Sequence, residues 1–329
     1  MNDSATIDGI AVPTPEAIAA TRKALAPWIA ETPVFTRAGF PGAPDGATLQ
    51  FKFELLQNAG TFKARGAFNN ILALDAAQKA RGVTAISAGN HAIAVAWAAQ
   101  KLGVPAKVVM LASANPARVA FAKSCGAEVL MAPDGATGFA MVGDIQKNEG
   151  KFFVHPFNGL NTVLGTATLG AEWAEQSGGL DAVVLPIGGG GLAAGVATAF
   201  RLAMPKVEIF GVEPEGATGM AQSFATNGPV KMGAMSSIAD SLCAPHTEAY
   251  SYGLCRRAID ALVTINDDDL RGAMKLLFSE LKIAVEPACA AATAGVLGPL
   301  RERLAGKKIG VLLCGSNTDL ATVVKHIGA

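Results

Sequence analysis

Short apolar runs alternate with amphipathic stretches along most of the chain. The runs are typical of buried strands: TLQFKFEL, GVTAIS, AKVVML, AEVLMA, LDAVVLPI, VEIFGVEP, ALVTI and KKIGVLLC. Stretches with helical spacing include FKARGAFNNILAL, NHAIAVAWAAQKLG, NPARVAFAKSCG, LAAGVATAFRLAM, a segment near 254–262, DDLRGAMKLLFSE and the C-terminal residues. Strands that alternate with helices favour parallel sheets with helices on their faces. The predicted fold class is therefore α/β.

The length of 329 residues suits one large domain or two smaller ones. One expected helix, over 91–102, is apolar on nearly every side, so other elements must cover both of its faces. The strand–helix units over 82–132 are compact and consecutive, which indicates a small lobe of their own.

Composition narrows the class of protein. The formal net charge is zero and no basic block occurs, so we expect no nucleic-acid partner. The N-terminus lacks the pattern of a signal peptide, and no unbroken run of about 18 apolar residues predicts a membrane span. The chain has five cysteines, which is an odd number, and it has no CxxC motif. Neither a disulfide framework nor a zinc site is therefore indicated. We therefore expect a cytoplasmic protein.

Lys63 stands in an unusual place in the stretch GTFKARGAFNNI. Thr61 is a suitable N-cap, which puts Lys63 in the first helical turn, where the helix dipole disfavours a cation. Its neighbours Phe62 and Ala64 are apolar. Both effects favour the neutral amine, and a neutral amine is what Schiff-base chemistry with a carbonyl requires. The alternative is an ordinary surface lysine.

Three turns carry candidate binding groups. Four glycines, Gly188, Gly189, Gly190 and Gly191, separate a strand from a helix and allow close approach of a phosphate. The stretch AISAGNHAIAV places Ser87, Asn90 and His91 at a helix start, which favours an anion, although a plain helix cap explains the same residues. Cys314, in LLCGSNTDL, is by itself best explained as a buried small hydrophobe.

The glycine turn also matches a loose dinucleotide fingerprint, with Gly188, Gly190, Ala193 and Glu213. This keeps a nicotinamide-dependent oxidoreductase open as an alternative. The unit comes past the midpoint of the chain, however, and it leaves Lys63 unexplained. A lysine together with a phosphate cradle instead suggests an aldehyde cofactor with one phosphate, namely pyridoxal 5'-phosphate.

The motifs NAGTFKARGA, SAGNHA, GGGG and LLCGSNTDL occur in this order, from ETPVF to NTDL. With them the chain resembles the fold-type II (tryptophan synthase β-like) pyridoxal phosphate enzymes, in the threonine/serine dehydratase and serine racemase branch. The resemblance implies that Lys63 forms the internal aldimine, Phe62 packs beside the ring, Asn90 binds the phenolic oxygen and Cys314 faces the pyridine nitrogen. It also implies that the four glycines hold the phosphate. Ser87, Gly89, Asn90 and His91 would bind the substrate carboxylate.

The resemblance further implies a large cofactor-binding domain (1–81 and 159–329), a small domain (82–158) and a homodimer. In metal-binding relatives an acidic residue lies six positions beyond the Glu of GVEP, where this chain has Gly219. A divalent cation is therefore doubtful, although Glu213 and the Ala217 carbonyl remain. No C-terminal extension follows the catalytic portion, so we expect no regulatory domain.

The function expected from the resemblance is an ammonia-lyase (dehydratase) that converts a β-hydroxy amino acid, L-serine or L-threonine by default, to a 2-oxo acid and ammonia. A hydroxyaspartate or an aryl-serine is an alternative substrate. Serine racemisation is the rival on the same scaffold, but Ala88 stands where related racemases have a serine hydroxyl for the second face of Cα. A catalytically silent metabolite-binding protein is the third alternative.

Overall fold

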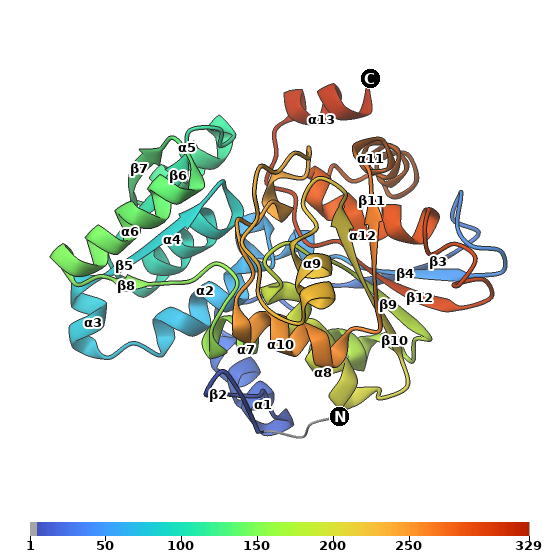
Figure 1. The fold of residues 1–329 in the computed structure, drawn as a ribbon, viewed down its shortest axis with the longest axis horizontal. Helices are drawn as coiled ribbons and strands as arrows, with labels where there is room; N and C mark the ends of the chain where they lie inside the picture. Colours follow the sequence, from blue (N-terminus) through green and yellow to red (C-terminus); the bar gives the residue numbers. More distant parts are fainter. Residues whose placement is uncertain (1–4, 329) are drawn as a thin grey trace.

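The computed structural model describes residues 5–328, which form two helix-covered sheets side by side (Figure 1) and a separate antiparallel pair of short strands, β1 and β2. The larger sheet has the order β11-β10-β9-β12-β4-β3 and the smaller one β7-β6-β5-β8. All neighbouring strands in both sheets are parallel except β3, which runs antiparallel to β4 at the edge. The predicted α/β class is confirmed. Among the described residues, no helix has the length and apolar character needed to span a membrane.

The strands are β1 Thr6–Ile7, β2 Ile10–Ala11, β3 Val34–Ala38, β4 Thr48–Lys52, β5 Val83–Ser87, β6 Ala106–Leu111, β7 Glu128–Ala132, β8 Phe152–Phe153, β9 Ala182–Pro186, β10 Glu208–Pro214, β11 Ala261–Ile265 and β12 Lys308–Leu312. The α-helices are α1 Pro15–Leu25, α2 Lys63–Leu72, α3 Ala76–Arg81, α4 Asn90–Leu102, α5 Pro116–Ser124, α6 Gly135–Glu149, α7 Leu160–Ser177, α8 Gly191–Ala203, α9 Gly219–Thr226, α10 Ala249–Ala258, α11 Asp267–Leu281, α12 Pro287–Leu297 and α13 Leu320–Ile327. Three short 3₁₀ turns lie at Glu54–Leu56, Asn58–Gly60 and Asp240–Leu242.

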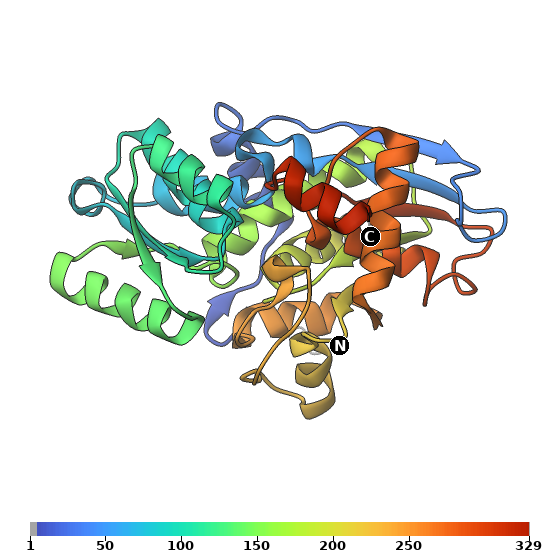
Figure 2. The same ribbon diagram turned by 90° about the horizontal axis from the view of Figure 1, so that it is seen from above.

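Burial explains the apolar runs. Every residue of β9 is buried, as expected for a central parallel strand with helices on both faces. The helix α4 is buried on most sides, as its sequence predicts, and ends at Gly103 in the left-handed conformation (φ 64°). Figure 2 shows the smaller sheet and its helices on the left, and the larger sheet with the C-terminal helix α13 on the right.

The helix α2 connects the two halves of the molecule. It packs against α7 and α4, and its side chains Phe68 and Ile71 belong to the apolar core beneath the smaller sheet. The helix α2 lies before residue 82 and still contributes to the core of the smaller sheet. The domain boundary predicted at residue 82 therefore stays a prediction. Residues 1–4 and 329 of the predicted large domain lie outside the described residues.

Several element boundaries differ from the sequence predictions, among them the end of β4, which stops at Lys52. The helix expected near 254–262 is α10, which begins at Ala249 and ends at Ala258. Its buried face, formed by Tyr250, Leu254 and Ala258, has helical spacing, but the intervening Ser, Tyr and Gly obscure it. The strand β12 ends at Leu312, two residues before Cys314.

Candidate active site

A pocket of about 740 Å³ lies at the carboxyl ends of strands from both sheets, and it includes the last residues of β5, β6 and β9. In parallel α/β sheets this is the usual side for a ligand. The structure brings to its wall these predicted residues: Phe62, Lys63, Ser87, Asn90, His91, Gly188, Gly189, Gly190, Gly191 and Cys314. Gly89 lies behind the wall, where a Cβ would come within 2.3 Å of Arg118 Cδ. Glu213 and Ala217 are not part of the lining.

Lys63 is the first residue of α2. Its Nζ donates a hydrogen bond to the carbonyl oxygen of Pro156 and lies 5.1 Å from the centre of the Phe62 ring. Burial of the amine lowers the pKa of Lys63 to about 8, although nearby Cys314 and Glu286 oppose the shift. The amine is therefore much closer to neutral at physiological pH than an ordinary lysine, which is the property that addition to an aldehyde requires.

The predicted N-cap of α2 is wrong by one residue. Phe62 holds the N-cap position, and Thr61 is extended (φ −162°) in a bridge with Gly315. The Thr61 hydroxyl still accepts a hydrogen bond from the Lys63 N–H group at 3.4 Å. The Thr61 side chain therefore caps the helix as expected. Because Thr61 pairs with the segment after β12, it lies one position before the N-cap residue.

The glycine turn has no room for side chains. A Cβ on Gly189 would come within 2.3 Å of Phe157 Cγ, and one on Gly191 within 2.5 Å of the Phe157 carbonyl oxygen. Gly190 has a φ of 91°, which disfavours any side chain. The turn leads directly into α8, whose first N–H groups have no partner within the helix. Bare backbone at a helix N-terminus fits a phosphate.

The loop after β5 likewise joins a strand to the N-terminus of a helix, since α4 begins at Asn90. The His91 ring donates from Nε2 to the carbonyl oxygen of Val154 at 2.7 Å. Burial, with the nearby Lys63 adding to it, lowers the pKa of His91 to about 3, so the ring is neutral and its single N–H is engaged. Any bond from His91 to a substrate carboxylate would therefore come from its backbone N–H group.

Sequence reasoning missed the polar network around Asn90. The Asn90 amide donates to Glu286 Oε1 at 2.6 Å and accepts from Asn317 Nδ2 at 2.8 Å. Arg118 donates to Glu286 Oε2 at 2.8 Å and to Asp240 Oδ2 at 2.7 Å. Burial raises the pKa of Glu286 to about 7, and Arg118 opposes the shift. This network fixes the orientation of the Asn90 amide at the pocket wall.

Cys314 is buried at the pocket wall, and its thiol pKa lies well above the ordinary value because of a hydrogen bond with Cys289 and burial. The group is therefore a neutral thiol at physiological pH. A thiol is a weak hydrogen-bonding group, so it would leave a pyridine nitrogen largely unprotonated.

The residues around Glu213 do not fit a divalent cation. Both oxygens of the Glu213 carboxylate accept backbone N–H bonds from the start of α9, from Met220 at 2.7 Å and Ala221 at 2.8 Å. Burial raises the pKa of Glu213 to about 7, against those two hydrogen bonds. The carboxylate caps a helix, and Gly219 supplies no second carboxylate beside it.

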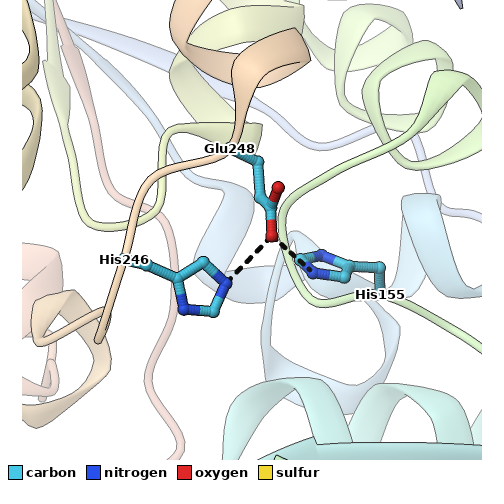
Figure 3. A group of neighbouring side chains, drawn as sticks. All are labelled: His155, His246 and Glu248. Carbon is cyan, nitrogen blue, oxygen red and sulfur yellow. Dashed lines mark ion pairs between the residues drawn. The ribbon is translucent and has the colours of Figure 1, made fainter. Parts of the chain in front are cut away.

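Figure 3 shows three neighbouring side chains, His155, His246 and Glu248, whose possible ligand atoms lie close enough together to bind one ion. The Glu248 carboxylate lies 3.0 Å from His246 Nε2 and 3.8 Å from His155 Nε2. However, His155 Nδ1 accepts backbone N–H bonds from Phe157 and Asn158, so the ring proton is on Nε2. A histidine that binds a metal at Nε2 would instead donate from Nδ1. The group therefore does not fit a cation.

The same hydrogen bonds give His155 a structural role. They fix the turn over 155–158, which presents the Pro156 carbonyl to Lys63 and the Phe157 ring to Gly189. Burial, with His246 and Lys63 contributing, lowers the pKa of His155 to about 3, so the ring stays a neutral acceptor at physiological pH.

Comparisons with known proteins agree with this geometry. The sequence profile of the family described as "Pyridoxal-phosphate dependent enzyme" matches residues 25–315. A phenylserine dehydratase of Ralstonia pickettii is 60% identical over 322 residues, which cover 98% of each chain. A beta-hydroxyaspartate dehydratase of Paracoccus denitrificans is 34% identical over 94% of this chain and 98% of its own. The structure of maize serine racemase superposes with a TM-score of 0.88 at 33% identity, over 95% of this chain and 96% of that one.

Proposed function

The chain belongs to the fold-type II pyridoxal phosphate enzymes of the serine/threonine dehydratase and serine racemase family, and we propose that its substrate is a β-aryl serine such as 3-phenylserine. As a pyridoxal phosphate-dependent dehydratase, it eliminates water from a β-hydroxy amino acid, and hydrolysis of the resulting imine takes up one water and releases ammonia. The cofactor, when bound, supplies an aldehyde that captures the substrate amine and a ring that acidifies the Cα–H bond. With phenylserine the products are phenylpyruvate and ammonia.

The observation that carries the choice of substrate is the chemistry of the pocket wall. Among the described lining residues Lys63 is the single cationic side chain, whereas Asp240, Asp267 and Glu286 are acidic. Once Lys63 holds the cofactor, no cation remains for a second carboxylate, which disfavours a hydroxyaspartate. The wall instead offers these apolar side chains: Ile86, Leu111, Phe139, Leu242 and Pro245. A phenyl group on the substrate would cover this apolar surface. The methyl group of threonine would leave most of it exposed to water.

Residues at the pocket wall supply the roles that this reaction requires. With the cofactor and substrate bound, the Lys63 amine would be the base that takes the proton from Cα. The Ser87 hydroxyl and the first N–H groups of α4 bind the substrate carboxylate, and the glycine turn binds the phosphate. Cys314 would lie at the pyridine nitrogen of the cofactor as a neutral thiol, a weak hydrogen-bonding partner that would suit elimination of the β-hydroxyl.

Racemisation is disfavoured by Ala88, which lines the pocket beside Ser87. Inversion at Cα needs a proton donor on each face, and a methyl group donates none. Ala88→Ser should raise the ratio of racemisation to elimination, since a correctly placed acid is worth about 10²–10⁴-fold in rate. D-serine released by the wild type as fast as pyruvate would show that another group serves the second face.

The test is a panel of L-serine, L-threonine, 3-hydroxyaspartate and the stereoisomers of 3-phenylserine, with release of 2-oxo acid measured for each. We expect the highest kcat/KM for one pair of phenylserine isomers that share a configuration at Cα. A higher kcat/KM for threonine or hydroxyaspartate would overturn the proposed substrate and leave the dehydratase assignment in place.

A further inference from the structure

One aromatic side chain, Phe139 on α6, reaches the pocket from the smaller sheet. We propose that Phe139 is the residue that selects an aryl group at Cβ of the substrate, an inference that rests on the proposed function. The substrate ring packs against the open face of Phe139, and this contact discriminates phenylserine from threonine.

The position of Phe139 follows from the packing of α6 on β5. A Cβ on Gly138 would come within 2.3 Å of Ile86 Cδ1, so the helix backbone lies directly on that side chain. Ile86 precedes Ser87, which begins the loop proposed to bind the substrate carboxylate. The contact between α6 and β5 therefore places Phe139 next to the bound amino acid.

Three neighbouring rings hold Phe139 in place. Its ring centre lies 6.3 Å from Phe153 in an edge-to-face arrangement, 5.3 Å from His246 and 6.4 Å from His155. The residue is only half-buried, so part of its ring faces the pocket. A ring that is fixed by its neighbours and open on one side is pre-organised for a further aromatic contact.

The opposite wall is also apolar and is joined to the cofactor site. A Cβ on Gly188 would lie 3.0 Å from Leu242 Cα, so the segment that carries Leu242 and Pro245 packs on the glycine turn. An aryl group that leaves Cβ towards α6 would thus lie between Phe139 and this segment. Aromatic pairs gain energy beyond the area they bury, which gives Phe139 its selectivity.

The test uses the holoenzyme with Phe139→Ala and Phe139→Leu, and Phe153→Leu as the matched control. Phe153 contacts Phe139 but is not part of the pocket lining. Two quantities are measured for each variant. The first is the ratio of kcat/KM for phenylserine to that for threonine. The second is the affinity for L-phenylalanine relative to that for L-alanine. Both amino acids lack a β-hydroxyl, and their binding is measured from the absorbance of the bound cofactor.

We expect Phe139→Ala to lower both ratios by about tenfold or more and Phe139→Leu to lower them by about threefold. Phe153→Leu should lower them by less than about twofold, because the rings of His155 and His246 still hold Phe139. Melting temperatures show whether each variant is folded, and Phe139→Leu keeps the test valid if the alanine variant is not. Equal losses for both substrates, or equal losses in Phe139→Leu and Phe153→Leu, would overturn the assignment. The binding ratio is measured without turnover. A wild type that does not turn over phenylserine but binds L-phenylalanine more tightly than L-alanine would therefore contradict the proposed function and still support this role of Phe139.

Discussion

The ring of Phe157 lies where a side chain on Gly189 would begin, with Cγ only 2.3 Å from the position of a Cβ. Gly189→Ala should therefore displace either the ring or the glycine turn. Overpacking of this kind costs about 1–3 kcal/mol, and if the turn moves, cofactor affinity falls by roughly 10- to 100-fold. Gly143→Ala is the control, because its Cβ would meet nothing within 4 Å on an exposed face of α6. Cofactor affinity is measured by absorbance after dialysis. Full retention in Gly189→Ala would mean that the phosphate is bound elsewhere.

The pKa of Lys63 predicts how cofactor uptake depends on pH. Because a neutral amine is the reactive form and its pKa is lowered to about 8, the rate of uptake by the apoenzyme should rise about tenfold between pH 7 and pH 9 and then level off. Stopped-flow absorbance measures this rate, with a free lysine derivative as the reference. A rate that keeps rising to pH 10, as for the reference, would show that the pocket does not shift this pKa.

A buried ion-pair network supports the helix that carries Lys63. Glu172 on α7 binds Lys52 Nζ at 2.5 Å and Arg65 Nη2 at 2.9 Å, and Arg65 on α2 also binds Glu54. All four side chains are almost wholly buried. Removing one partner leaves an uncompensated charge inside the protein.

Glu172→Gln should therefore lower the free energy of unfolding by about 3–5 kcal/mol. Glu175→Gln, on the same helix, breaks only an exposed pair with Arg22 and should cost less than about 1 kcal/mol. Urea denaturation at pH 7 measures both. Equal effects of the two substitutions would contradict the assigned importance of the buried network.

The sequence predicted the strands β4 to β7 and β9 to β12, and the turns that follow them, because those signals are local, whereas the two-residue strands β1, β2 and β8 and the edge strand β3 were missed. An apolar run that ends in glycines, as at Gly188, needs no distant partner to be recognised. Glu286 and Arg118 were missed because each looks ordinary in its own segment, and only the fold brings them to Asn90. The helix α7 was missed because it is rich in threonine and glycine, and packing between α2 and α8 stabilises it more than helix propensity does.

Removal of metal should have little effect. Since both Glu213 oxygens are bound by the N–H groups of Met220 and Ala221, a chelator should leave the melting temperature and the rate of 2-oxo acid release unchanged. The matched measurement adds Mg²⁺ or Ca²⁺ after the chelator. Loss of activity that either ion restores would show that other oxygen ligands complete a cation site.

Every role assigned to the pocket depends on Lys63 as the residue that carries the cofactor. The direct measurement is reduction of the purified holoenzyme with borohydride, followed by digestion and mass mapping of the pyridoxyl label. One labelled peptide, containing Lys63, is the expected result. Lys63→Ala should carry no label and should lose several powers of ten in rate, since it lacks both the cofactor attachment and the base. A label on another lysine, such as the buried Lys52, would contradict the assignment of the active site.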